Sequence, residues 1–174
     1  MDIHGQVWKY GDNIDTDVII PGRYCNISDP QELAKYALAD LDPDFVGKMS
    51  AGDIIVAGGN FGCGSSREVA PICIKAAGVS AVIAGSFARI FFRNAINIGL
   101  PIFQSAEAAE RIQEGDDVSV DATSGIITNH TRNESYKSAA FPEFIQDLVA
   151  QGGLIPYVQH KLAARKQAPA EPSA

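Results

Sequence analysis

The sequence predicts a single α/β domain, because short apolar segments with strand character alternate along the chain with segments whose apolar residues recur at helical spacing. The alternation is clearest at residues 53–57 and 79–84, two apolar runs that flank a helical stretch at residues 69–77. Gly78 directly follows this stretch and is a typical helix stop. Residues 53–84 therefore predict a β-α-β unit, and a length of 174 residues is sufficient for one core.

The elements before this unit follow from similar patterns. Residues 5–10 predict a first strand, and the apolar run at residues 18–21 predicts a second. Residues 30–39 repeat leucine and alanine at helical spacing, and Asp29 with Pro30 supplies a helix start.

After the β-α-β unit the alternation continues. It predicts in turn a helix, a strand, a short helix, a hairpin and a last helix, at residues 87–98, 101–103, 106–114, 118–128 and 141–151. Residues 163–174 are rich in alanine and proline and have no apolar period, so we expect a disordered tail there. The predicted domain therefore comprises residues 1–162.

A glycine-rich turn at residues 58–64 lies between the strand and the helix of this unit. Glycines let the backbone turn sharply and approach a ligand closely, and Ser65 and Ser66 follow at the start of the helix, where amides favour an anion. Arg67 adds a planar guanidinium that suits a carboxylate. The turn, including Gly64, therefore predicts a site for a small carboxylic acid. The alternative is that a serine only caps the helix while Arg67 is solvated.

Three better-known glycine motifs do not fit these residues. A nucleotide P-loop needs lysine after its last glycine, where this chain has Ser65. A dinucleotide fingerprint needs a third glycine at the position of Arg67. A nucleophile elbow needs glycines two residues before and after the serine, and Cys63 and Arg67 stand there.

A second polar segment, residues 11–24, carries carboxylates at Asp12, Asp15 and Asp17. It lacks the glycine and the distant glutamate of an EF-hand, so it does not predict a metal site. On an extended segment Asp15 and Asp17 would share one face and could orient a serine or an arginine. The alternative is an Asx-rich turn that leads into a buried strand.

Together with residues 85–101 (GSFARIFFRNAINIGLP), these two segments resemble the small subunits of the aconitase-type hydro-lyases, in particular those of 3-isopropylmalate dehydratase. The resemblance covers roughly residues 4–160, with the motifs in the same order and spacing. It implies a swivelling domain of β/β/α layers. It also implies that Ser65 is the catalytic base, acting as an alkoxide, and that Asp17 lies beside it as a second catalytic residue.

The same resemblance assigns the substrate contacts. Ser66 and Arg67 would bind a substrate carboxylate with the amides of the turn at Gly64. Tyr24 would begin a mobile loop in which Asn26 contacts the variable arm of the substrate. The chain departs from the family at Val69, where histidine is usual, and this change could alter the handling of water or protons beside the serine.

Composition limits the partners and cofactors. The net charge of −7 argues against nucleic acid or an anionic membrane as partner. Cys25, Cys63 and Cys73 include no Cys-x-x-Cys pair, which predicts reduced thiols in a cytoplasmic protein and no iron–sulfur cluster in this chain. The resemblance implies that a large subunit holds a four-iron four-sulfur cluster; the isolated chain could form a homo-oligomer.

The expected function is that of a small subunit in a heteromeric hydro-lyase of leucine biosynthesis, which interconverts 2-isopropylmalate and 3-isopropylmalate by dehydration and rehydration. Two alternatives stay open: a related hydro-lyase of the dimethylmalate, homoaconitate or citrate type, and a carboxylate-binding module without catalysis. Asn26 argues against a homoaconitase, which would use a cation for the longer acidic arm.

Overall fold

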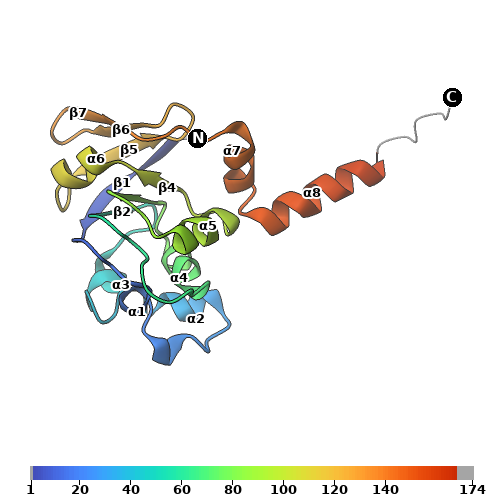
Figure 1. Ribbon diagram of the computed structural model, residues 1–174, viewed down its shortest axis with the longest axis horizontal. Helices are drawn as coiled ribbons and strands as arrows, with labels where there is room; N and C mark the ends of the chain where they lie inside the picture. Colours follow the sequence, from blue (N-terminus) through green and yellow to red (C-terminus); the bar gives the residue numbers. More distant parts are fainter. Residues whose placement is uncertain (1, 168–174) are drawn as a thin grey trace.

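The computed structural model describes residues 2–167, which fold into a curled seven-stranded sheet with helices around it (Figure 1). The strand order is β4-β3-β2-β1-β5-β6-β7. The strands are β1 (Asp2–Lys9), β2 (Ile54–Ala57), β3 (Ala81–Ala84), β4 (Ile102–Gln104), β5 (Asp117–Asp121), β6 (Ile126–Asn129) and β7 (Glu134–Lys137). The helices are α1 (Thr16–Ile19), η1 (Gly22–Tyr24), α2 (Pro30–Ala34), α3 (Phe45–Lys48), α4 (Val69–Ala77), α5 (Arg89–Asn97), α6 (Ala106–Arg111), α7 (Glu143–Ala150) and α8 (Leu154–Gln167).

Strand β1 joins two kinds of sheet. It pairs in parallel with β2, and the parallel pairing continues through β3 to β4. On its other side it pairs antiparallel with β5, which leads through β6 to β7. All residues of β2 and β3 are buried, as expected for parallel strands covered on both faces, whereas burial alternates along β5.

The sheet curls strongly, because α6 contacts both β3 and β7. Five strand spacings separate these strands in the sheet order, which would be about 24 Å on a flat sheet. A helix about 10 Å across could not lie against both. The curl brings the antiparallel half over the parallel half, and the α/β layered fold predicted from the sequence is therefore confirmed (Figure 1).

Helices α2, α4, α5, α7 and α8 contact one another in a chain along the molecule. Helix α2 packs on α4, α4 contacts α5, and α5 contacts both α7 and α8. Helix α8 extends away from the body of the molecule (Figure 1). Among the described residues no helix is long and apolar enough to cross a membrane.

The central β-α-β unit agrees with the prediction. Helix α4 spans residues 69–77 and ends at Gly78, which adopts the left-handed conformation (φ 106°) and returns its N–H to the carbonyls of Ile74 and Lys75. Strands β2 and β3 then pair in parallel register. The apolar period of residues 69–77 and the stop signal at Gly78 were sufficient to predict this helix and its end.

The strand predicted at residues 18–21 is wrong. Asp15 accepts a hydrogen bond from the amide of Val18 and caps helix α1, so the apolar run begins as a helical turn. Ile19 and Ile20 are both fully buried. Burial explains the apolar residues equally well in either conformation, so a run of this length does not identify a strand.

Other differences concern short or late elements. Strand β7, helix α3 and helix α8 were not predicted. Helix α8 continues through Gln167, so residues 163–167 of the predicted disordered tail are helical, in keeping with good helix formers such as Ala163 and Ala164. Residues 168–174, the remainder of that tail, lie outside the described residues.

Candidate active site

The glycine turn after β2 is held between two other segments of the chain. On one side the amide of Gly62 donates to the carbonyl of Ile14 at 2.7 Å, and the amide of Thr16 donates to the carbonyl of Cys63 at 2.9 Å. On the other side the amide of Phe61 donates to the carbonyl of Ser86 at 2.9 Å. The three segments that carry the family resemblance therefore meet at this turn.

Glycine is required at the centre of the turn. Gly62 has φ 77°, and a Cβ atom there would lie 2.2 Å from the ring of Phe91. Gly64 has φ 86°, a conformation that other L-residues rarely adopt. The backbone at Gly62 can therefore pack directly against α5, and the chain then turns at Gly64 so that Ser65 lies at the surface.

Ser65 and Ser66 are exposed, and neither hydroxyl has a hydrogen-bond partner among the residues that the structure describes. The residue before α4 is Glu68, which makes no capping hydrogen bond through its side chain. The interpretation of these serines as helix caps is therefore wrong. Val69 opens the helix and packs against the core.

Arg67 and Asp17 form an ion pair, with Arg67 Nη2 2.6 Å from Asp17 Oδ1. Arg67 Nη1 also donates to the carbonyl of Ile20 at 3.1 Å. The arginine side chain is 21% exposed, so it is held against helix α1 while part of the guanidinium faces outward. Asp17 thus contacts the arginine of the motif, and no hydrogen bond joins Asp17 to Ser65 among the residues that the structure describes.

The other two carboxylates of the acidic segment are structural. Asp15 caps α1, and Asp12 accepts a hydrogen bond from the amide of Gly59 at 2.6 Å. The segment is a capped turn and helix, so the prediction that Asp15 and Asp17 share the face of an extended segment is wrong.

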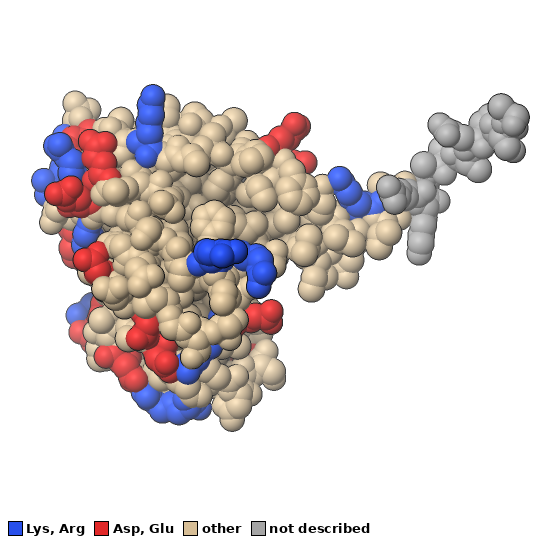
Figure 2. Space-filling view, in the orientation of Figure 1, with Lys and Arg blue, Asp and Glu red and all other residues tan. Residues whose placement is uncertain are grey.

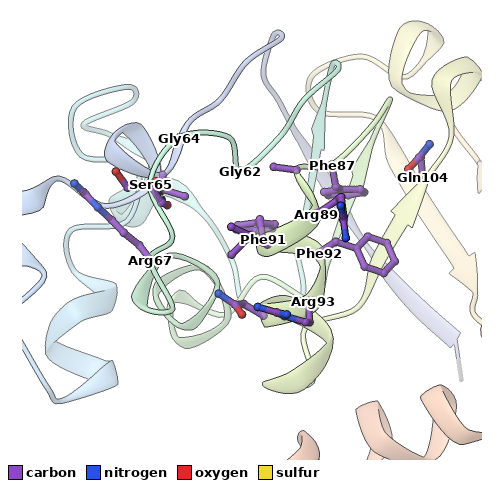
Figure 3. A pocket seen from close by; sticks show the side chains of 14 residues that line it. Gly62, Gly64, Ser65, Arg67, Phe87, Arg89, Phe91, Phe92, Arg93 and Gln104 are labelled. Atoms are coloured by element: carbon purple, nitrogen blue, oxygen red, sulfur yellow. Dashed lines mark hydrogen bonds between the residues drawn. The ribbon is translucent and has the colours of Figure 1, made fainter.

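A cavity of about 740 Å³ lies over this turn (Figure 3). Gly64, Ser65 and Arg67 lie at one end of it, and Arg89, Phe92 and Gln104 lie at the other, with Phe91 between them (Figure 3). The cavity combines cations and aromatic walls with the Ser65 hydroxyl, which has no hydrogen-bond partner within residues 2–167. This combination suits an organic acid of small to moderate size.

Several cavity residues were not identified from the sequence. Thr16 is 2% exposed and donates from Oγ1 to the carbonyl of Ser65 at 2.9 Å, so it fixes the main chain that carries the serine. The residues of α5 reach the cavity because Phe61 and Phe87 form a bridge between distant segments. A sequence pattern contains no signal for such a bridge.

The residues of the predicted substrate loop do not line the cavity. Tyr24 stacks on Tyr36 with ring centroids 3.8 Å apart, and the Arg23 guanidinium lies 4.7 Å from the Tyr24 ring. Asn26 is exposed at the end of this segment. Gly22 lies beside the Arg67 guanidinium, so the loop adjoins the site even though neither Tyr24 nor Asn26 lines the cavity.

The thiols do not form a metal site. No group of three metal-binding side chains exists among the described residues. Cys73 is fully buried, and burial, reinforced by Cys25, raises the pKa of its thiol to about 12. This set of donors does not fit an iron–sulfur cluster, which requires several thiolates placed close together.

The fold and the site define a domain of the aconitase type, and residues 31–107 match the family model for the aconitase C-terminal domain. The chain is 60% identical to the 3-isopropylmalate dehydratase small subunit of Moorella thermoacetica over 162 residues, or 93% of this chain and 98% of that protein. It therefore belongs to the family of 3-isopropylmalate dehydratase small subunits.

Two further relatives extend the comparison. The chain is 61% identical to the 2,3-dimethylmalate dehydratase small subunit of Eubacterium barkeri over 158 residues, covering 91% of this chain and 97% of that one. The solved structure of 3-isopropylmalate dehydratase from Methanocaldococcus jannaschii superposes with a TM-score of 0.89 at 45% identity. That alignment covers 97% of this chain and all of the other.

Proposed function

We propose that this chain is the small subunit of a hydro-lyase that interconverts 2-isopropylmalate and 3-isopropylmalate, the dehydration and rehydration step of leucine biosynthesis. The observation that carries the proposal is the exposed, unpartnered Ser65 hydroxyl in the same cavity as Arg67, on a chain about 60% identical to dehydratase small subunits. The cytoplasm is the expected compartment, because the thiols are free.

In this proposal Ser65 acts as an alkoxide, the form that the family resemblance implies, and takes the proton from the carbon next to a substrate carboxylate to become a neutral hydroxyl. Electrons from that C–H bond form the double bond as hydroxide leaves the neighbouring carbon, and readdition of water in the opposite sense gives the isomer. Arg67 and the amides of the turn at Gly64 stabilise charge that develops on the carboxylate. Ser66 supplies a further hydrogen bond to the substrate.

Asp17 is assigned a positioning role. It holds the Arg67 guanidinium from one side, while the carbonyl of Ile20 holds it from another. An arginine has five N–H donors, so these contacts leave donors for a substrate carboxylate. Asp17 would therefore act on the substrate through Arg67.

Departure of hydroxide needs an acid or a metal, and the donors of this chain do not fit the four-iron four-sulfur cluster that the family resemblance implies. We therefore assign the cluster to the large subunit. The proposed division of labour gives proton removal and carboxylate binding to this chain.

A second candidate substrate is 2,3-dimethylmalate, because one of the most similar relatives is named for that activity at 61% identity. Both acids offer a carboxylate to Arg67 and differ in the apolar groups that they carry. The aromatic end of the cavity is compatible with either of them.

Co-expression with a cluster-bearing large subunit tests the proposal. The purified complex should convert isopropylmalate with a higher kcat/KM than dimethylmalate, homocitrate or citrate, and the isolated chain should be inactive. A preference for dimethylmalate would select the second candidate. A complex that binds these acids without turnover would support the non-catalytic binding module.

A further inference from the structure

The exposed side of helix α5 differs in charge from the rest of this acidic chain. We define the α5 face as Arg89, Ile90, Phe92 and Arg93, all of which are exposed. Ile90 is 43% exposed and Phe92 is 40% exposed, so both side chains place apolar surface beside the two arginines. The α5 face thus combines two cations with apolar surface.

The two arginines of the α5 face have no ion pair among the described residues. Every other arginine whose side chain the structure describes contacts a carboxylate, in the pairs Arg23–Asp40, Arg67–Asp17, Arg111–Glu134 and Arg132–Asp116. In a chain of net charge −7, two neighbouring guanidinium groups without an ion pair to any described carboxylate indicate that their carboxylates come from another molecule. In Figure 2 the basic side chains over α5 lie in a largely uncharged area, while acidic side chains gather mainly at the left edge.

The α5 face also separates two hollows. One is the cavity that contains Ser65 and Arg67. The other, of about 620 Å³, is mainly apolar and lies between Phe92 and Arg93 on one side and Phe141 and its neighbours on the other. A small organic acid bound at Ser65 would leave the second hollow uncovered, because Ser65 does not line it. A protein surface could cover both hollows and the helix between them.

We propose that the α5 face docks on the large subunit, which presents carboxylates to Arg89 and Arg93 and an apolar side chain to the hollow beside Phe92. The inference rests on the proposed function, because a partner that completes the chemistry at Ser65 must cover the cavity that α5 also lines. Arginine and aromatic residues are enriched at the centres of protein interfaces, in agreement with this composition.

The test measures the Kd between this chain and its large subunit, without substrate. The double variant Arg89→Glu/Arg93→Glu should raise the Kd about 100-fold, and Phe92→Ala should raise it about tenfold. For wild type the Kd should rise with salt, and this dependence should be largely lost in Arg89→Gln/Arg93→Gln. Circular dichroism verifies that each variant is folded.

The matched control is Lys48→Glu/Lys137→Glu, which makes the same change in charge on α3 and β7 and should leave the Kd within about twofold. An unchanged Kd for the α5 variants, or absence of any complex with wild type, would overturn the docking proposal. Variants that bind normally but lose turnover would also overturn it, since the arginines would then serve the substrate. A wild-type complex that forms but does not isomerise isopropylmalate would contradict only the proposed substrate.

Discussion

Arg67 and Asp17 connect the glycine turn to helix α1 through an ion pair of 2.6 Å. The pair orients a cation beside Ser65 and at the same time partly neutralises it. A substrate carboxylate that binds Arg67 therefore approaches a guanidinium that is already paired, so its affinity depends on how Asp17 holds the arginine. Kinetic constants can separate such positioning from direct participation in proton transfer.

Asp17→Asn should raise KM about tenfold or more and lower kcat by a smaller factor, because the substitution removes the charge that holds Arg67. Steady-state kinetics of the reconstituted complex measures both constants. Asp40→Asn is a suitable control, because Asp40 pairs with an arginine at the surface outside the cavity. A large fall in kcat at constant KM would instead support a direct role of Asp17 beside Ser65.

Ser65→Ala should lower kcat by a factor on the order of 10² to 10⁴ and change KM only a few-fold, because the hydroxyl acts mainly in the transition state. Ser66→Ala should mainly raise KM. The two variants are controls for each other, since the residues are adjacent and both are exposed. Small and equal effects of the two substitutions would contradict the assignment of Ser65 as the base.

Asn26→Arg should shift selectivity toward an acid with a distal carboxylate, by about 1.5 to 3 kcal/mol for one charge-assisted hydrogen bond. It should disfavour an isopropyl arm, which would leave the new cation desolvated. The ratio of kcat/KM for isopropylmalate and homocitrate measures the shift, with Ser28→Arg in the same loop as control. If both variants keep the wild-type ratio, Asn26 does not contact the substrate.

Asp116 should make stability depend on pH. Its side chain is only 6% exposed. Burial alone would raise its pKa, but hydrogen bonds from Gln113, Asn129 and Arg132 hold the pKa below the ordinary value. A lowered folded-state pKa stabilises the protein above the unfolded-state pKa of about 3.9, and this contribution is lost as pH falls through the folded-state pKa.

Asp116→Asn should therefore reduce the free energy of unfolding by about 1 to 3 kcal/mol at neutral pH, and the difference from wild type should narrow in acid. Urea unfolding at about pH 7 and about pH 3 measures this change. Asp147→Asn, at an exposed position on α7, should have little effect at either pH. A difference from wild type that is the same at both pH values would argue against the pKa shift.

The parts of the fold that the sequence predicted are those with local causes. Helix α4 has a regular apolar period and a glycine stop, and both act within a few residues of the helix. The run at residues 18–21 has no such period, and the helical turn that Asp15 caps includes only its first two residues, Val18 and Ile19. Helix α8 was not predicted because most of it has no buried face, so there is no apolar period to detect.

In the candidate site, too, the contacts within one segment were predicted and the contacts between distant segments were not. The prediction placed Ser65, Arg67 and the glycines together because they are close in sequence. The prediction did not include Thr16 under Ser65 or the wall formed by Phe91 and Gln104, because these contacts depend on how distant segments pack. The ion pair of Asp17 with Arg67 likewise depends on the position of α1 in the fold.

Helix α8 extends from the body of the molecule, and each residue from 158 to 164 is exposed (Figure 1). Backbone hydrogen bonds alone give a segment of this length little stability in water. Its amide protons should therefore exchange with solvent much faster than those of β2 and β3, and a protease should cut there before it cuts the sheet. Limited digestion would then yield a shorter domain that keeps the glycine turn and its cavity, because both are built from residues that precede α7.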